Sequence, residues 1–432
     1  MNYYIGRRQF LLGSVVTGAS LALESYSKGL QSALANQDLI KVGIIESHYK
    51  DGAGNSSAIA QGVFLALQEI NQSGGVLGKA VTASLAEVSK VANYLKTAAI
   101  TNWFGNPDLL GQYPSSGLFW SPEIVSPQVQ FSPYTFYLGA TPNQQLEPAV
   151  NWLLDEKGSD FFLIGNDGEG SRLSNAIVKQ QLQSRRAKVA GEFVLPRYSH
   201  TPSAMQSVLS EIKTALPQGG IIFNTLSSSE SVALFNGLKQ ANFTPKQYPV
   251  MSLGLTEAEV ATLNPAIVAE HYIVQNYLHT LNTPENQSWV RAYRKQYPQV
   301  KVPSTVAQAA YSMVYLWKQT VETAQTTADV EAIREAAIRQ QLSAPEGTIQ
   351  IAHNHHLTRT PRIGQIDRDG SVQTVAVASE APVPPIPWHH YAIALTGTGR
   401  PNLGHWSKPF QKGKTKIATR SLWRGMKTSQ FA

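Results

Sequence analysis

Histidines gather in two short stretches near the carboxyl end of the chain, and their imidazole nitrogens could bind a metal. They are His353, His355 and His356 in one stretch and His389 and His390 in the other. A metal site needs ligands that converge from fixed elements, with second-shell partners to orient them. The first group falls in a predicted turn between strands, where polar side chains cap backbone groups. The sequence therefore predicts no metal and no cofactor.

A second stretch with chemical potential is the loop Gly165–Arg172, which lies between a predicted strand and a predicted helix. It lacks the spacing of G-x-G-x-x-G and of G-x-x-x-x-G-K-[ST], which argues against a nucleotide. A loop that opens a helix still directs free N–H groups towards a ligand. The sequence has no G-x-S-x-G elbow and its carboxylates are scattered. We therefore expect a binding protein and not an enzyme.

These stretches lie within a long alternation of strands and helices. The sequence predicts a buried strand at residues 39–45 and a second strand at residues 81–88. Between them, a helix is predicted from the helical spacing of the apolar residues Ile59, Val63, Leu67 and Ile70. Such β-α-β units favour parallel sheets with right-handed crossovers. The alternation continues to residue 324, and a hairpin is predicted at Asp369-Gly370.

The length of 432 residues allows two α/β domains, and no internal repeat is visible. Ligands of open α/β sheets bind at the carboxyl ends of the strands, so we expect the site between two such lobes.

Charge and cysteine content exclude several classes of protein. The chain has no cysteine, which excludes disulfides and thiolate sites and suits an oxidising compartment. The net charge of +7 comes from the segment 400–432, which is basic and has no acidic residue. We interpret this tail as a solvated appendage, with attachment to a membrane surface or partner as the functional alternative. No nucleic-acid partner is predicted.

The amino terminus reads as an export signal. Arg7-Arg8 is followed by Gln9-Phe10-Leu11, which resembles the twin-arginine motif. The apolar stretch from Leu11 to Leu23 is shorter than a membrane span of about 20 residues and fits a signal peptide. Cleavage after Ala35 would give a periplasmic, or more generally extracytoplasmic, mature protein. An ordinary Sec signal and an uncleaved anchor are the alternatives.

Several collinear motifs resemble one family, the urea and short-chain-amide-binding proteins of the branched-chain amino acid transporter class. The resemblance covers roughly Ile40 to Trp388. It implies a two-lobed type I periplasmic-binding-protein fold, each lobe a parallel sheet flanked by helices, with a hinge of crossing strands. It also implies ABC transporter permease subunits as partners. The motifs are Gly139–Gln145, Pro148–Val150, Trp152–Leu154, Ile222–Leu226, Thr283–Asn286, Ala309–Tyr311, Tyr315–Trp317, Ala344–Gly347, Asn354–Leu357 and Arg362–Gly364.

The resemblance also gives expected domain boundaries. The signal peptide is expected at residues 1–35 and the basic tail at 391–432. Lobe 1 is expected to comprise residues 36–147 and, where the chain returns to it, 276–342. Lobe 2 is expected to comprise residues 148–275 and, where the chain returns to it together with the hinge, 343–390.

The chain departs from the family where ligand residues are expected. The segment between Val88 and Gly117 is shorter by about one strand-and-helix unit, and Asn102–Asn106 is what remains of it. Trp120-Ser121 stands where the family has Tyr-Pro. Gly168 and Gly170 replace two aromatic residues, which would enlarge the pocket and loosen the loop.

The predicted ligand-binding residues are Trp120, Ser121, Asn166, Asp167, Arg172, Asn224, Thr225 and Ser252. An ion pair between Asp167 and Arg172 that stabilises the loop is the alternative to ligand contact for those two.

Two functions follow from the sequence. The first is a transporter-linked solute-binding protein for urea, a short amide or an amino-acid-like solute, or for a larger or more anionic ligand held by Arg172. The second is a degenerate homologue that acts as a ligand sensor or scaffold without transport, which the shortened lobe 1 and the basic tail favour.

Overall fold

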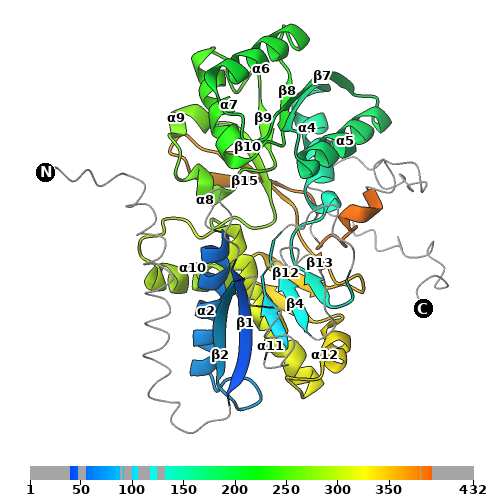
Figure 1. Cartoon of the computed structure of the whole chain (residues 1–432). Helices are drawn as coiled ribbons and strands as arrows, with labels where there is room; N and C mark the ends of the chain where they lie inside the picture. The colour runs from blue at the N-terminus through cyan, green and yellow to red at the C-terminus, as the bar shows by residue number, and fades with distance from the viewer. Residues whose placement is uncertain are drawn as a thin grey trace, which may run out of the picture.

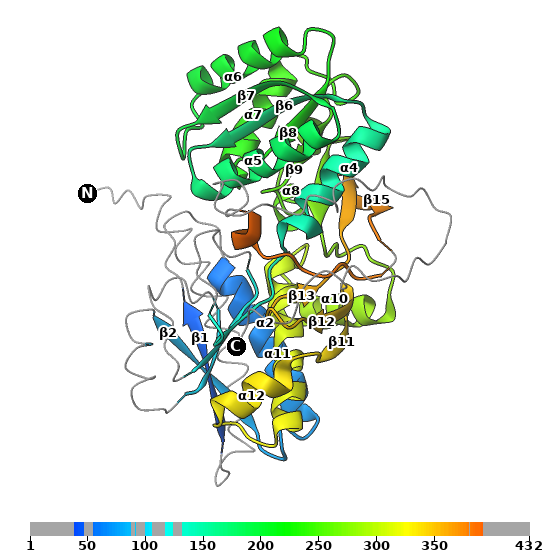
Figure 2. The same ribbon diagram turned by 90° about the vertical axis from the view of Figure 1, so that its right-hand side faces the viewer.

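The computed structural model describes residues 39–46, 55–87, 91, 100–105, 117–123, 132–379 and 381–391. The predicted signal peptide and basic tail lie outside these residues, as does most of the shortened segment before Gly117. Two α/β lobes lie one above the other (Figures 1 and 2). Each is built around its own mainly parallel sheet, as the β-α alternation predicts.

Lobe 1 contains a five-stranded parallel sheet in the order β2-β1-β3-β4-β5. The predicted gap in this lobe is partly filled, because residues 102–104 pair with β1 and β4 as a strand of the sheet. The strands are β1 (Ile40–Glu46), β2 (Val81–Glu87), β3 (Asn102–Phe104), β4 (Leu118–Ser121) and β5 (Thr135–Tyr137). The helices are α2 (Asn55–Gln72), α10 (Pro284–Gln296), α11 (Thr305–Ala324) and α12 (Val330–Ala337).

The close packing of α2 on α11 closes lobe 1. Ile59, Val63 and Ile70 of α2 are buried in one core with residues of α11. Gly62 permits the contact, because a Cβ there would lie 2.2 Å from the carbonyl oxygen of Ala307. The helical spacing seen in the sequence therefore marks the face on which α11 packs.

Lobe 2 contains a seven-stranded sheet in the order β15-β14-β10-β9-β8-β6-β7, in which β14 and β15 are antiparallel. The predicted hairpin at Asp369-Gly370 joins them. The strands are β6 (Asp160–Asn166), β7 (Lys188–Leu195), β8 (Ile221–Asn224), β9 (Val250–Ser252), β10 (Tyr272–Gln275), β14 (Arg362–Ile366) and β15 (Val372–Val377). The helices are α4 (Leu146–Glu156), α5 (Glu169–Ser184), α6 (Pro202–Ala215), α7 (Ser228–Gln240), α8 (Glu257–Val260) and α9 (Pro265–Val268). A short 3₁₀ helix, η2 (Pro142–Gln144), lies in the segment that leads into α4.

The chain passes between the lobes through residues 138–145, 276–283 and 359–361, the three crossing segments. A small sheet, β11 (Gln341–Ala344), β12 (Gly347–Ile351) and β13 (Leu357–Thr358), precedes the last crossing. Its apolar side chains, including Ile349 and Ile351, are buried in the core of lobe 1. We therefore propose that the return to lobe 2 begins after β13 and not at residue 343.

Candidate functional site

The carboxyl ends of β6, β8 and β9 lie side by side in lobe 2, because these strands are parallel neighbours. The strands end at Asn166, Asn224 and Ser252, and Thr225 follows β8 directly. Parallel strands present their carboxyl ends at a single edge, which is where α/β proteins bind ligands. The structure thus brings the lobe 2 residues predicted from the sequence to one edge.

Asn224 and Ser252 form the inner layer of this edge. The Asn224 Nδ2 group donates to the Oγ atoms of Ser252 and Ser231, 3.0 Å away in each case. Its Oδ1 atom accepts the backbone N–H of Leu226 at 3.0 Å. Both Asn224 and Ser252 are completely buried. Their hydrogen-bonding groups are used within the protein, so they position the loop after β8.

Thr225 connects β8 to the first turn of α5. Its Oγ1 atom lies 2.8 Å from Ser171 Oγ, 2.8 Å from Asn175 Oδ1 and 3.1 Å from the carbonyl oxygen of Ile164. Ser171 Oγ in turn accepts the backbone N–H of Asn166 at 2.9 Å. A hydroxyl has one proton to donate, so Thr225 donates to one acceptor while Ser171 donates to Thr225.

Gly165 makes this arrangement possible. A Cβ at this position would lie 2.2 Å from Ser171 Oγ and 2.7 Å from Thr225 Oγ1. Any side chain here would displace the two hydroxyls, so the glycine is required for the close approach of the loops.

Asn166 is held by a buried carboxylate that the sequence reasoning missed. Its Nδ2 group donates to Glu230 Oε2 at 2.7 Å, and its Oδ1 atom accepts the N–H of Gly168 at 3.0 Å. Glu230 is fully buried and also accepts from the N–H and hydroxyl of Ser227 and from the N–H of Tyr198. The pattern Ser227-x-x-Glu230, a capping box at the start of α7, was the feature of the sequence that could have pointed to Glu230.

Asp167 and Arg172, in the loop after β6 and the first turn of α5, are exposed to solvent. Arg172 Nε donates to the backbone carbonyl of Asp167 at 3.1 Å, and the Asp167 carboxylate accepts the N–H of Arg197 at 2.8 Å. The two side chains therefore bond to backbone, and the alternative ion pair between them is not formed. Helix α5 begins at Glu169, earlier than predicted, which places Arg172 in its first turn.

Gly168 and Gly170, for which the sequence resemblance predicts a loss of two aromatic residues, have different surroundings. A Cβ at Gly170 would meet no atom within 4 Å, whereas one at Gly168 would lie 2.7 Å from both Arg197 Nε and Asn166 Oδ1. A side chain could therefore be accommodated at Gly170, whereas one at Gly168 would displace Arg197 or Asn166.

The lobe 1 residues of the predicted site lie in a different environment. Trp120 is completely buried and stacks on Phe136 with ring centroids 4.4 Å apart, and Phe136 stacks on His355 at 4.7 Å. Ser121, at the end of β4, is also buried. Trp120 Nε1 and Ser121 Oγ have no hydrogen-bond partner within the part of the chain that the structure describes. Trp120 therefore belongs to the core of lobe 1.

The histidine turn packs against β5. His355 Nδ1 lies 3.1 Å from the carbonyl oxygen of Thr135, and His356 stacks on Tyr137 with centroids 4.9 Å apart. Burial lowers the pKa of each of these histidines to about 4. Both are neutral at pH 7, with their rings in aromatic stacks. Within the described ranges, no group of three or more histidine or acidic residues could hold a metal ion.

A cavity of about 360 Å³ lies at a different place, where the second crossing segment meets α10. His279, Asn282, Asn286 and Arg291 are among the residues that line it, and none of the predicted ligand residues is. His279 Nδ1 lies 2.7 Å from the buried carboxylate of Glu257. We place the candidate site at the carboxyl edge of lobe 2, because there the polar side chains converge from several strands.

No helix among the described residues is long and apolar enough to cross a membrane. The carboxyl edge of lobe 2 offers exposed Asp167 and Arg172, an open space at Gly170 and a rigid hydrogen-bonded support behind them. Such an arrangement can hold a polar solute by hydrogen bonds and charge without covalent chemistry.

Residues 129–393, more than half of the chain, match the family described as the periplasmic binding protein domain. The chain also resembles the solute-binding protein of an ABC transporter from Rhodopseudomonas palustris BisB5, solved with 3,4-dihydroxybenzoic acid. The TM-score is 0.69 at 15% identity, over 81% of this chain and 99% of that chain.

A branched-chain amino acid transporter substrate-binding protein from Streptococcus pneumoniae, solved with isoleucine, gives a TM-score of 0.63 at 17% identity. The match covers 79% of this chain and 99% of that chain. At such identities the likeness shows the fold, and it confirms the predicted two-lobed type I architecture.

Among curated proteins, a limonene hydroxylase from Geobacillus stearothermophilus is 34% identical over 119 residues. The match covers 28% of this chain and 22% of that protein, so the chain spans about a fifth of the length of this relative.

Proposed function

The chain belongs to the periplasmic binding protein family, and from that premise we propose that it is the solute-binding component of an ABC transporter. Membership confirms the prediction of a binding protein that is not an enzyme. The family description also supports the proposal that the protein acts outside the cytoplasm. In our proposal a small polar solute binds between the lobes, with Asn166, Asp167, Arg172 and Thr225 on the lobe 2 side and Ser121 on the lobe 1 side.

The observation that carries this proposal is the convergence at the carboxyl edge of lobe 2. Buried Glu230 and Asn224 hold the loops after β6 and β8 in place, and this prepares the exposed groups before a ligand arrives. Such preorganisation lowers the cost of ordering the loops on binding.

Among the candidate solutes, we favour one with a carboxylate over urea or a short neutral amide. Arg172 provides an exposed cation in the first turn of α5, at the carboxyl edge of the sheet. A small neutral amide would need flat apolar walls to exclude water, and Trp120 is already stacked within the core. The related proteins solved with 3,4-dihydroxybenzoic acid and isoleucine bind carboxylate-bearing molecules, which is consistent with this choice.

A thermal-shift screen of the purified protein tests the proposal. The ligands are benzoate, isoleucine, urea and formamide, each over a range of concentrations. A ligand at 100 times its Kd should stabilise the protein by about 2.7 kcal/mol. We expect a rise in Tm with a carboxylate and none with urea. A rise in Tm with urea alone would show that the ligand is a neutral amide and not a carboxylate. No rise in Tm with any of these solutes would reject solute binding.

We further propose that Arg7-Arg8 directs export through a twin-arginine route and that the mature protein meets ABC permease subunits. Replacement of both arginines by lysine should retain the protein in the cytoplasm, as fractionation would show. Export that is unaffected by this change would favour the Sec alternative.

The burial of Trp120 favours a second candidate function. Trp120, Phe136 and His355 form a stack in which no ring is available to a ligand. A protein that has lost one wall of its site could act as a sensor or scaffold without transport. Tight binding of a small solute in the thermal-shift screen would argue against this candidate.

A further inference from the structure

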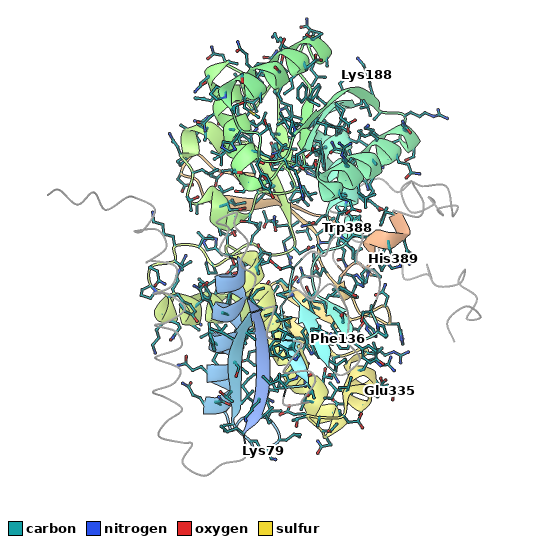
Figure 3. The ribbon with its side chains drawn as sticks, viewed as in Figure 1. Lys79, Phe136, Lys188, Glu335, Trp388 and His389 are labelled. Carbon is teal, nitrogen blue, oxygen red and sulfur yellow. The ribbon has the colours of Figure 1, made fainter. Side chains whose placement is uncertain are left out.

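A proline-rich segment near the end of the described chain runs beside the crossing segments. We call Val383–Tyr391 the strap; it contains Pro384, Pro385 and Pro387. Proline restricts the backbone and cannot donate a hydrogen bond, so such a segment is stiff and offers mainly carbonyl acceptors. Figure 3 shows Trp388 and His389 of the strap at the level between the two lobes.

The strap is bound to the first crossing segment by Asn143. The Nδ2 group of Asn143 donates to the carbonyl oxygen of Pro384 at 2.7 Å, and its Oδ1 atom accepts the N–H of Ile386 at 2.9 Å. One side chain thus satisfies both a donor and an acceptor of the strap backbone.

The third crossing segment binds the strap through its backbone. Arg359 and Val383 exchange N–H···O=C bonds of 3.2 and 2.6 Å, an isolated antiparallel bridge. Gln144 Nε2 donates to the carbonyl oxygens of Val383 and Leu357, 2.8 Å away in each case, and so joins the first crossing segment, the strap and β13.

The strap also contacts both lobes. On the lobe 1 side, Asn354 of the histidine turn donates to the carbonyl oxygen of Pro385 at 3.1 Å. On the lobe 2 side, Trp388 and Tyr391 are buried in the core around α4 and α5. Trp388 Nε1 donates to the carbonyl oxygen of Ala140 at 3.2 Å, and the Tyr391 hydroxyl donates to Glu147.

From these contacts we propose that the strap is a fourth element of the hinge and restricts the rotation of the lobes relative to each other. Hinge motion requires φ and ψ changes in the crossing segments. Residues 138–145 and Arg359 cannot change freely while a stiff segment bonds to both of them. Rotation therefore requires the strap to move with one lobe and lose its contacts to the other.

Distance measurements between spin labels on the two lobes test this proposal. The chain has no cysteine, so Lys188→Cys in lobe 2 and Glu335→Cys in lobe 1 introduce unique labelling sites. Both residues are exposed, and Figure 3 shows them on different lobes. In this background, Asn143→Ala and Trp388→Phe each remove bonds between the strap and the first crossing segment. We expect the interlabel distance distribution to broaden and gain a second population.

Two matched variants serve as controls. Trp152 has the same 6% exposure as Trp388 and lies in the same core, so Trp152→Phe reproduces the loss of ring volume. Asn151 accepts hydrogen bonds from Gln181 of α5 and from Arg185, which follows α5, so Asn151→Ala removes an amide within lobe 2. We expect both controls to keep the original distribution.

The strap proposal is overturned if Asn143→Ala and Trp388→Phe give the same distribution as their controls. The measurements are made without ligand, so they do not depend on the proposed function. A protein that binds no solute but shows the broadened distribution would refute solute binding and support the strap.

Discussion

At the carboxyl edge of lobe 2, polar side chains hydrogen-bond to one another, whereas at the same edge of lobe 1 aromatic rings stack on a histidine turn. Glu230, Asn166 and Thr225 form a network that holds exposed groups in front of it. Trp120, Phe136 and His355 fill the corresponding place in lobe 1 with buried rings. Two sheets of similar topology can therefore end in a prepared polar surface or in an extension of the core.

Removal of the stacked ring in lobe 1 should have the largest effect on stability. Truncation of a buried tryptophan costs about 3–5 kcal/mol, so Trp120→Ala should lower the unfolding free energy by that amount in urea denaturation. Val375→Ala, at an apolar residue of β15 that is 43% exposed, should change it by less than about 1 kcal/mol. If Trp120→Ala instead left stability intact and abolished solute binding, this edge of lobe 1 would be a ligand wall.

Acid should weaken the histidine turn. Burial lowers the pKa of His355 and His356 to about 4 from 6.5, so the unfolded chain binds protons at a higher pH than the folded chain. The contribution of these two histidines to the free energy of unfolding is fully present above pH 6.5. It is lost as the pH falls towards 4, by at most about 1.4 kcal/mol per pH unit for each histidine.

His355→Asn isolates one of these contributions. The backbone φ of His355 is +62°, a conformation that asparagine adopts readily. Between pH 6.5 and 4, unfolding free energies of the variant should fall less steeply than those of the wild type. Equal slopes would contradict a neutral, buried His355.

A pair of glycine substitutions tests the polar edge of lobe 2. Gly165→Ala forces a Cβ against the Ser171 hydroxyl and should destabilise the protein by about 1–3 kcal/mol. Gly170→Ala meets no atom within 4 Å and lies in the first turn of α5, so its stability should be unchanged or raised by up to about 1 kcal/mol. Equal effects of the two changes in thermal unfolding would show that the loops are not closely packed.

The smallest expected effect concerns charge at the exposed front of the edge. Arg172→Gln should raise the Kd for a carboxylate-bearing solute about fivefold, as is typical for the loss of one exposed ion pair, and leave the Kd of a neutral solute unchanged. Lys188→Gln, at the opposite end of the sheet, is the control. Calorimetric titration that finds equal losses for both solutes would assign Arg172 a role in loop structure.

The sequence predicts most of the fold because apolar periodicity is a local signal. The strand at residues 39–45, the helix through Ile59 and Ile70, and the hairpin at Asp369-Gly370 all form as expected. It does not predict helix α12 or strand β11. It also places the start of α5 too late, because Glu169 and Gly170 give no apolar signal.

The site is harder to predict because burial and partners depend on distant segments. An aromatic residue at a strand end reads equally as a ligand wall or as core, and Trp120 becomes core because Phe136 and His355 lie against it. Its sequence context identifies Glu230 as a helix-capping residue. Its hydrogen bond to Asn166, 64 residues away in the chain, cannot be predicted from the neighbouring sequence.

The contact between α2 and α11 has a consequence for how the chain folds. Glu69 of α2 accepts the hydroxyl of Tyr311 of α11, which lies 242 residues away. Helix α2 is synthesised early and packs on β1 and β2, but the face that contacts α11 can be covered only after α11 has been synthesised. The central strands and helices of lobe 2 lie between these two helices in the chain. Long loop closure slows such pairings. We therefore expect the central strands and helices of lobe 2 to fold before α2 packs against α11.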